Sequence, residues 1–268
     1  MISSLAPQGL VKRGLAAVGL LRPAFRLRER LRARSWRKPP PLAPDGLPLP
    51  DRLLMVRVVG HADWTQFYET GQAHAQVFAD LAASVGRPLS DARAVLDWGC
   101  GCGRVTRHLP RHTTALIFGR DPDAMTLGWS ARNLPGDFGV CGLHPPLDLA
   151  DGAIDAAISL SVFTHLGEQT QVQWLAELAR VIRPGGLLLL TFMDEQHDKA
   201  GQLGPAGADL AAKGFAVTTS ALEGTNHMAT FQTLAHVVAA ARPWFDAAAS
   251  RTSRETSLQQ AVVALVRR

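Results

Sequence analysis

One stretch constrains the fold of this chain more than any other: residues 95–104, which read Val-Leu-Asp-Trp-Gly-Cys-Gly-Cys-Gly-Arg. A short apolar run ends in a carboxylate, three glycines follow at alternate positions, and a helix-compatible stretch, Arg104 to Leu109, comes next. This pattern predicts a buried parallel strand, a tight turn and the start of a helix. Glycine suits a backbone that takes positive φ or that a ligand approaches closely. The stretch therefore predicts a site for a nucleoside-bearing ligand at the carboxyl end of a parallel sheet.

Length and composition indicate one domain of ordinary size with an appendage. The chain has 268 residues, of which 47% are hydrophobic, so a sizeable core can form. No apolar run approaches the roughly 20 residues of a membrane-spanning helix, and Leu15 to Leu21 lacks the flanks of a secretory signal. The only cysteines, Cys100, Cys102 and Cys141, are too sparse for a disulfide framework and lack a second cluster of metal ligands. We therefore expect a cytoplasmic protein that binds no metal.

Charge is distributed unevenly along the chain. Residues 1–50 contain ten basic and two acidic residues, so their net charge is +8, whereas residues 51–268 carry −3. Residues 1–38 are predicted to be a basic arm. Residues 39–50 hold six prolines and are predicted to be a stiff, extended linker without a packed core. The folded domain is then expected over residues 51–268.

The arm admits three interpretations that the sequence alone leaves open. Within it, residues 25–36 can form a helix on which Leu27 and Leu31 lie one turn apart, with arginines nearly all round. It can be a disordered tail, an interfacial helix on anionic membrane formed by residues 10–38, or an arm that binds nucleic acid or a protein partner. The chain as a whole carries no strong nucleic-acid signal.

A second strand and its terminal carboxylate extend the pattern. Residues 115–120 form an apolar run that ends at Asp121, and a carboxylate there can accept hydrogen bonds from both ribose hydroxyls of a nucleoside. Asp123 is a weaker candidate for the same role. Alternatively, the strand-end acid caps a helix that begins near Pro122.

Four stretches together resemble the class I S-adenosylmethionine (SAM)-dependent methyltransferases. The Asp-x-Gly-x-Gly-x-Gly spacing from Asp97 is similar to their first motif and differs from the Gly-x-Gly-x-x-Gly of dinucleotide-binding folds. Gly119-Arg-Asp121 resembles the end of their second strand. The segment Ser161–Leu166 resembles the one after their fourth strand, and residues 174–187, with Pro-Gly-Gly at 184–186, resemble the launch of their fifth.

The resemblance covers about residues 50–268 and implies the fold. It implies an α/β, Rossmann-like, doubly wound sheet of seven strands, mostly parallel with an antiparallel C-terminal strand. Helices are expected over Glu168–Arg183 and Thr233–Ala241, and strands over Phe245–Arg251 and Leu258–Val266. Residues 194–232 are expected to be irregular and to build the acceptor pocket.

The resemblance also implies site residues. The residues expected to bind SAM, and its product S-adenosylhomocysteine (SAH), are Asp97, Gly99, Cys100, Gly101, Gly103, Asp121, Pro122, Gly142, Leu143, Ser161, Tyr68 and Gly71. His165 either orients the substrate and acts as a base, or shapes its loop through a backbone hydrogen bond. Related sequences commonly place a histidine where this chain has Gln232, so His227 is either a substitute for it or a surface residue.

The implied function is transfer of a methyl group from SAM by in-line displacement. The protein then chiefly aligns the acceptor, and orientation alone is worth up to roughly 7–11 kcal/mol. No Asn-Pro-Pro-Tyr type motif indicates a nucleobase or glutamine acceptor, so we expect a small-molecule, sugar or lipid-linked glycan acceptor. Two alternatives stay open: a non-catalytic methyltransferase-like domain that binds a partner through its basic arm, and an NAD(P)-dependent oxidoreductase.

Overall fold

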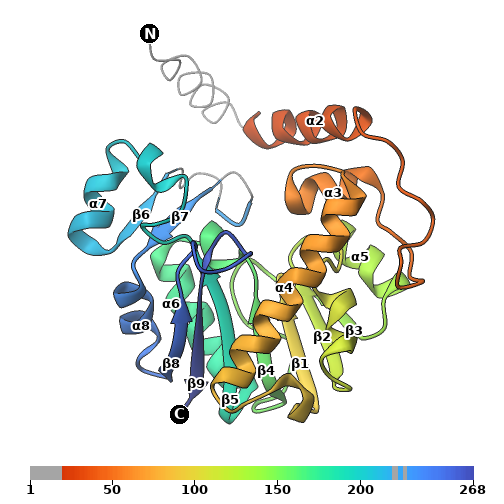
Figure 1. Ribbon diagram of the computed structural model, residues 1–268. Helices are drawn as coiled ribbons and strands as arrows, with labels where there is room; N and C mark the ends of the chain where they lie inside the picture. The colour runs from red at the N-terminus through yellow and green to blue at the C-terminus, as the bar shows by residue number, and fades with distance from the viewer. Residues whose placement is uncertain (1–19, 219–222, 226–227) are drawn as a thin grey trace.

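The computed structural model describes residues 20–218, 223–225 and 228–268, and Figure 1 labels its elements. The first half contains α2 (Leu21–Arg34), α3 (Arg52–Val59), α4 (Trp64–Ser84), η1 (Leu89–Asp91), β1 (Ala94–Trp98), η2 (Thr106–Arg111), β2 (Leu116–Asp121), α5 (Ala124–Asn133) and β3 (Asp137–Val140). The second half contains β4 (Ile154–Ser159), η3 (Phe163–His165), α6 (Glu168–Val181), β5 (Ile182–Phe192), η4 (Ala200–Gln202), α7 (Ala206–Lys213), β6 (Phe215–Val217), β7 (Thr230–Gln232), α8 (Leu234–Ala241), β8 (Phe245–Arg251) and β9 (Ala261–Arg267).

A seven-stranded sheet in the order β3-β2-β1-β4-β5-β9-β8 forms the centre of the molecule. Strands β1 to β5 pair in parallel, and β9 runs antiparallel to both β5 and β8. This confirms the predicted doubly wound α/β sheet with an antiparallel C-terminal strand. The chain leaves β1 first toward β2 and β3 and later returns toward β4 and β5. A ligand crevice is therefore expected where the carboxyl ends of β1 and β4 diverge.

Helices cover both faces of this sheet, and the alternation along the strands shows why (Figure 1). On β5, Leu188 and Leu190 join a core cluster with Trp174 and Leu178 of α6. Leu187 and Leu189 face the other way and join a cluster that includes Phe78 and Leu81 of α4. A strand buried on both faces reads as a continuous apolar run, as Leu187–Leu190 does. Each fully buried leucine contributes about 1.5–3 kcal/mol.

The proline-rich segment is part of the folded body, which differs from the predicted extended linker. Ala43 and Leu49 are buried in a cluster with Ala33, Met55 and other residues of α2, α3 and α4. Its anchor is an ion pair in which the Arg107 guanidinium donates to both carboxylate oxygens of Asp45, each at 2.8 Å. The prolines stiffen the segment, and this contact docks it onto the domain.

Two further expectations differ from the structure. The stretch after the glycine turn is the short 3-10 helix η2, because Pro110 cannot donate the backbone bond that a longer helix needs. The segment 194–232, expected to be irregular, holds α7 and a two-stranded sheet, β6–β7. The apolar side chains of Met193, Leu203, Leu210, Ala216 and Phe231 form a separate small core there.

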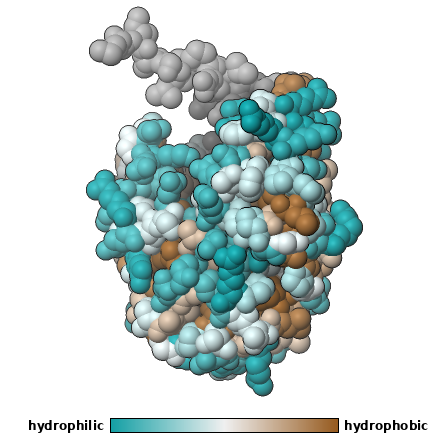
Figure 2. All heavy atoms as spheres, turned by 45° about the vertical axis from the view of Figure 1, so that its right-hand side comes forward, coloured by the Kyte–Doolittle hydropathy of each residue, from teal (hydrophilic) through white to brown (hydrophobic). Residues whose placement is uncertain are grey.

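The end of the molecule where the parallel strands finish carries α2 and α3 on one side and the α7–β6–β7 insert on the other (Figure 1). Across the described ranges, no helix has the length and apolar character needed to cross a bilayer. The face in Figure 2 is mostly hydrophilic, with small, separate hydrophobic patches.

Candidate functional site

The turn after β1 has three positions whose backbone conformation and tight surroundings favour glycine. Gly99, Gly101 and Gly103 have φ values of +82°, +54° and +72°, a region that side-chain-bearing residues rarely adopt. A Cβ at Gly99 would overlap the Val162 side chain, and one at Gly101 would lie 2.9 Å from Cγ2 of Val58 on α3. The turn is therefore packed between α3 and the segment after β4, with no room for side chains.

Asp97 lies beneath this turn and is almost fully buried. Its Oδ2 accepts a hydrogen bond of 2.5 Å from the Thr106 hydroxyl, on η2. Burial raises the pKa of Asp97 to about 6, and the nearby charge of Asp121 adds to this. Cys100 and Cys102 are buried beside it, and burial raises the pKa of both thiols, so they stay protonated. Small side chains that fit a tight turn account for them.

Asp121 ends β2 directly beside the turn. Its Oδ2 accepts from the Gly101 N–H and its Oδ1 from the Asp123 N–H, both at 2.8 Å. Burial raises the pKa of Asp121 to about 6. Each carboxylate oxygen has a second lone pair, so the group can still accept bonds from two hydroxyls. The sequence leaves open whether Asp121 binds a ribose or caps the next helix. Asp123 is the residue that caps α5, so the Asp121 carboxylate is not used as that cap.

The remaining residues around β2 and β3 lie at the rim. Pro122 is exposed, and Asp123 forms an ion pair of 3.0 Å with Arg57 of α3. Gly142 is exposed, and Leu143 is half-buried at the edge of the core. The Leu143 carbonyl accepts a hydrogen bond of 2.8 Å from Nε1 of Trp174, which fixes the backbone after β3.

Tyr68 and Gly71 lie on α4, and the two positions have different surroundings. The Tyr68 hydroxyl lies 2.9 Å from Nη2 of Arg111, its ring meets His108 edge-on, and so its polar end is engaged at η2. Gly71 packs directly against the backbone carbonyl of Arg104, so a Cβ there would overlap it. Gly71 thus lets α4 approach the glycine turn closely.

Ser161 follows β4 in a left-handed conformation, with φ of +61°. Its N–H donates to the Thr191 hydroxyl at 2.8 Å, and its hydroxyl accepts from Nε2 of Gln260 at 2.6 Å. The Gln260 side chain also accepts from Thr191, at 2.7 Å. A conformation that costs about 1–3 kcal/mol is therefore held by residues that β5 and the loop before β9 supply. Sequence reasoning missed Thr191 and Gln260 because their contacts are non-local.

His165 ends η3 and points toward the insert. Its Nδ1 lies 2.7 Å from the carbonyl oxygen of Met228. A carbonyl only accepts, so Nδ1 carries the hydrogen and Nε2 is left with its lone pair. Burial lowers the pKa of His165, which keeps the ring neutral near pH 7. Both functions expected of this residue, shaping the loop and offering a base, fit the geometry. His227 lies outside the described residues.

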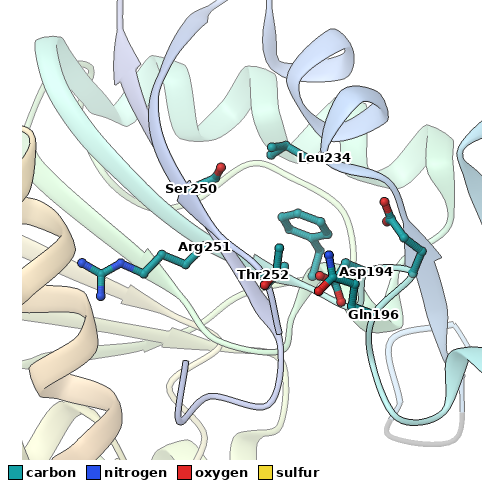
Figure 3. Close-up of a pocket in the computed structure, with 9 residues that line it drawn as sticks. Asp194, Gln196, Leu234, Ser250, Arg251 and Thr252 are labelled. Atoms are coloured by element: carbon teal, nitrogen blue, oxygen red, sulfur yellow. The ribbon is translucent and has the colours of Figure 1, made fainter. Parts of the chain in front are cut away.

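A small hollow opens at another part of the same sheet edge, between the ends of β5 and β8 (Figure 3). Its volume is about 50 Å³, room for a few water molecules. Asp194, on its wall, accepts from the hydroxyl of Ser253 at 2.6 Å, and Arg251 extends away from the other labelled side chains (Figure 3). The hollow is too small for a nucleoside and lies apart from the glycine turn.

The glycine turn fits a nucleoside-bearing cofactor on three observations. The turn presents backbone without Cβ atoms, a buried carboxylate lies beside it on β2, and the two stand next to the point where the strand order reverses. Arg104, at the end of the turn, is a charged residue to which the sequence analysis assigns no role. Its guanidinium Nη1 lies 2.9 Å from Nδ1 of His74.

Comparisons with known proteins agree with this geometry. Residues 96–190 match a family model described as a methyltransferase domain. Comparison with curated proteins finds no significant match.

Several solved structures share the fold. Magnesium protoporphyrin IX methyltransferase from Synechocystis PCC 6803, solved with bound SAH, is similar with a TM-score of 0.55 and 18% identity, over 80% of this chain and 97% of that one. The 1,6-didemethyltoxoflavin-N1-methyltransferase of Burkholderia thailandensis, solved with 1,6-didemethyltoxoflavin and SAH, gives 0.53 and 18%, over 79% and 84%. A SAM-dependent methyltransferase from Methanosarcina mazei gives 0.52 and 17%, over 66% and 93%. At these identities the likeness establishes the fold.

Proposed function

We propose that this chain is a class I SAM-dependent methyltransferase and that it methylates an oxygen or nitrogen of a small-molecule, sugar or lipid-linked glycan acceptor. The match of residues 96–190 to a methyltransferase-domain model supports the proposal. The observation that carries the proposal is the contact between the glycine turn and Asp121, at the point where the strand order reverses. When bound, SAM supplies a methyl group on a sulfonium, which is already activated for displacement.

The cofactor would lie across the carboxyl ends of β1 to β3. Asp121 would accept the ribose hydroxyls, and the backbone of Gly99, Gly101 and Gly103 would let the ligand lie close. Gly142 and Leu143 would flank the base. The resemblance implies that Tyr68 contacts the cofactor, but its hydroxyl lies 2.9 Å from Nη2 of Arg111, which supports a role in holding η2 against α4 instead.

His165 is the base in this proposal. Its Nδ1–H donates to the Met228 carbonyl, which orients Nε2 as a proton acceptor. Its pKa is lowered by burial, so it is neutral and ready to accept a proton from an acceptor hydroxyl at neutral pH. A neutral amine acceptor would depend on it less.

Calorimetric titration with SAM and SAH tests the cofactor assignment. We expect micromolar binding that falls at least tenfold in Asp121→Ala and in Gly101→Val, because the first removes the ribose acceptor and the second fills the turn. Asp123→Ala is the matched control, since it removes a neighbouring carboxylate that caps α5, and it should keep affinity within about threefold. If the intact chain binds neither ligand, the non-catalytic alternative replaces this proposal. If it binds and turns over NAD(P)H, followed at 340 nm, the oxidoreductase alternative does.

Two observations support the proposed class of acceptor. The porphyrin and toxoflavin methyltransferases that share the fold are named for small-molecule acceptors. The α7–β6–β7 insert stands next to His165, whose Nδ1 it contacts through Met228. A screen of small molecules, sugars and lipid-linked sugars for SAH release would test the class, and release with nucleic acid alone would contradict it.

We also propose that α2 places the chain at the inner face of an anionic membrane. Leu20, Leu27 and Leu31 are 53%, 58% and 57% exposed and form one stripe at helical spacing. The surrounding exposed side chains of α2 include Arg26, Arg28, Arg30 and Arg34. Apolar residues flanked by arginines favour an anionic lipid surface. In Figure 1 this helix lies at the same end of the molecule as the carboxyl ends of the parallel strands.

Sedimentation with vesicles tests this contact. The full chain should sediment with phosphatidylglycerol-containing vesicles and not with pure phosphatidylcholine, and Leu27→Asp/Leu31→Asp should reduce binding at least tenfold. Leu116→Asp is the matched control, because Leu116 is 55% exposed at the start of β2. Equal binding to both vesicle types, or none, would contradict the proposal, as would tighter binding to nucleic acid.

A further inference from the structure

Three arginines, the buried Arg107 and Arg120 and the half-buried Arg104, differ in how their charge is compensated. The guanidinium of Arg107 pairs with Asp45 at 2.8 Å, and that of Arg120 pairs with Asp148 at 2.6 Å and Asp137 at 3.0 Å. Arg104 forms no ion pair with any carboxylate in the ranges that the structure describes. Charged side chains that lose most of their water are normally paired, so the half-buried guanidinium of Arg104, which lacks an acid, can hold an anion.

The known partners of Arg104 are both neutral and both on α4. Its Nη1 lies 2.9 Å from Nδ1 of His74 and 3.4 Å from the hydroxyl of Thr70. Nε2 of His74 lies 3.1 Å from the Ser257 carbonyl, so Nε2 carries the hydrogen and Nδ1 accepts from the arginine. Burial and the Arg104 charge lower the pKa of His74 to about 4, so it stays neutral. These contacts orient the guanidinium without neutralising it.

The remaining donors of Arg104 are available to a ligand. All of its hydrogen bonds within the described part of the chain use Nη1, which leaves Nε and Nη2 as an unused fork. Burial lowers the pKa of Arg104 to about 10, and the nearby charge of Asp97 offsets this only in part. A planar fork of N–H donors matches a carboxylate in geometry and charge.

The position of Arg104 indicates which carboxylate. Asp121 on β2 contacts Gly101 near one part of the turn, and Arg104 ends the turn beneath α4. A nucleoside with its ribose at Asp121 would extend its 5′ substituent over the turn toward β1. Asp97 on β1 is close enough that its charge and that of Arg104 affect each other's pKa, yet the two form no ion pair. The negative charge of Asp97 and the positive charge of Arg104 therefore lie near each other without pairing. This arrangement suits a ligand end that carries both an ammonium group and a carboxylate.

We propose that Arg104 binds the carboxylate of the amino-acid end of SAM, and that Thr70 and His74 hold its guanidinium in place for this contact. The inference rests on the proposed function and adds a residue that recognises the cofactor at the end opposite the ribose.

Two ligands that differ in the amino-acid end test the inference by calorimetry. SAH carries the carboxylate, and 5′-methylthioadenosine has the same nucleoside without it. In Arg104→Gln we expect SAH affinity to fall about 10- to 100-fold, the range for a lost charge-assisted hydrogen bond, and methylthioadenosine affinity to change less than twofold. Arg104→Lys, which keeps the charge, should recover part of the SAH affinity. Arg87→Gln, an exposed arginine at the opposite edge of the sheet, is the matched control and should bind both ligands as the parent does.

The outcomes separate this inference from the proposed function. If the parent chain binds SAH and Arg104→Gln weakens both ligands equally, Arg104 has a purely structural role and the inference fails alone. Unchanged SAH affinity in Arg104→Gln would also overturn it and would leave the cofactor assignment standing. If Arg104→Gln does not fold, Arg104→Lys decides, since an equal loss for both ligands again contradicts the inference. A parent chain that binds neither ligand overturns both.

Discussion

Buried carboxylates at the ends of β1 and β2 make the stability of this chain depend on pH. Burial raises the pKa of Asp97 to about 6, whereas an unfolded aspartate titrates near 3.9. The folded state therefore binds more protons between about pH 4 and 6, and the free energy of unfolding falls as pH rises through that window. The shift is worth about 2–3 kcal/mol, fully lost above pH 7.

Asp97→Asn should remove this penalty, since the amide still accepts from Thr106. Without cofactor, we expect the variant to be more stable than the parent by about 1–3 kcal/mol at pH 7.5 and equal to it near pH 4, as measured by urea unfolding. Asp155→Asn is the opposite control. Although burial raises the pKa of Asp155, hydrogen bonds from Arg183 and two backbone N–H groups lower it overall. That variant should be less stable than the parent at pH 7.5.

A second prediction concerns the stability lost when a glycine of the turn is replaced. Gly99→Ala combines an unfavourable φ with overlap of the Val162 side chain, so we expect a loss of about 2–4 kcal/mol. Gly86→Ala is the matched control, because Gly86 has φ of +70° and open space around it. It should lose only about 1–2 kcal/mol. Thermal unfolding would measure both. Equal losses would show that the contact with Val162 is unimportant.

At this scale the sequence predicts the residues that define the turn and misses those that support it. Asp97, Asp121 and the three glycines follow from a local pattern, because strand, turn and carboxylate are adjacent along the chain. Arg104 and Gln260 acquire their roles from partners far away in sequence, His74 and Ser161 respectively. No periodicity or motif encodes such contacts.

Among the elements, the proline-rich segment is where sequence and structure differ most. The six prolines predict a stiff, extended segment that stands apart from the domain. A single aspartate reverses this, because Asp45 meets the buried guanidinium of Arg107. The sequence does not predict the pairing of Asp45 with Arg107, because an acidic residue within a proline-rich segment is normally expected to face solvent. The short length of η2 is predictable from the sequence, because Pro110 lies within it and lacks the backbone N–H of a helical residue.

Asp45→Asn should leave the Arg107 charge buried without its partner. We expect a loss of about 3 kcal/mol in the free energy of unfolding, the usual consequence of removing one member of a buried pair. Asp209→Asn removes an exposed partner of Lys213 and should change stability by no more than about 0.5 kcal/mol. Urea unfolding in parallel would compare them. A loss below 1 kcal/mol in Asp45→Asn would mean that the segment is not docked in solution.

For the whole molecule, the topology is predictable and the N-terminal boundary is not. The resemblance carried by motifs at the ends of β1, β2 and β4 implies the parallel order. In contrast, α2, the proline-rich segment, α3 and the start of α4 share one apolar cluster. The predicted division at residue 50 passes through that cluster. The body that folds together thus extends to α2.

A chain that begins at residue 51 should therefore be less stable than the full chain. It would lose the Asp45–Arg107 pair and expose Met55, which is fully buried. We expect the midpoint of thermal unfolding to fall by several degrees, by calorimetry. Equal midpoints for the two chains would restore the independent-linker interpretation.

The contact between His165 and Met228 has a consequence for how such an enzyme diversifies. The insert orients the imidazole through a backbone carbonyl, a group that every amino acid carries. The side chains of this segment can therefore change in evolution while the tautomer of His165 is kept. The insert also has its own small core, so its sequence can vary without disturbing the glycine turn.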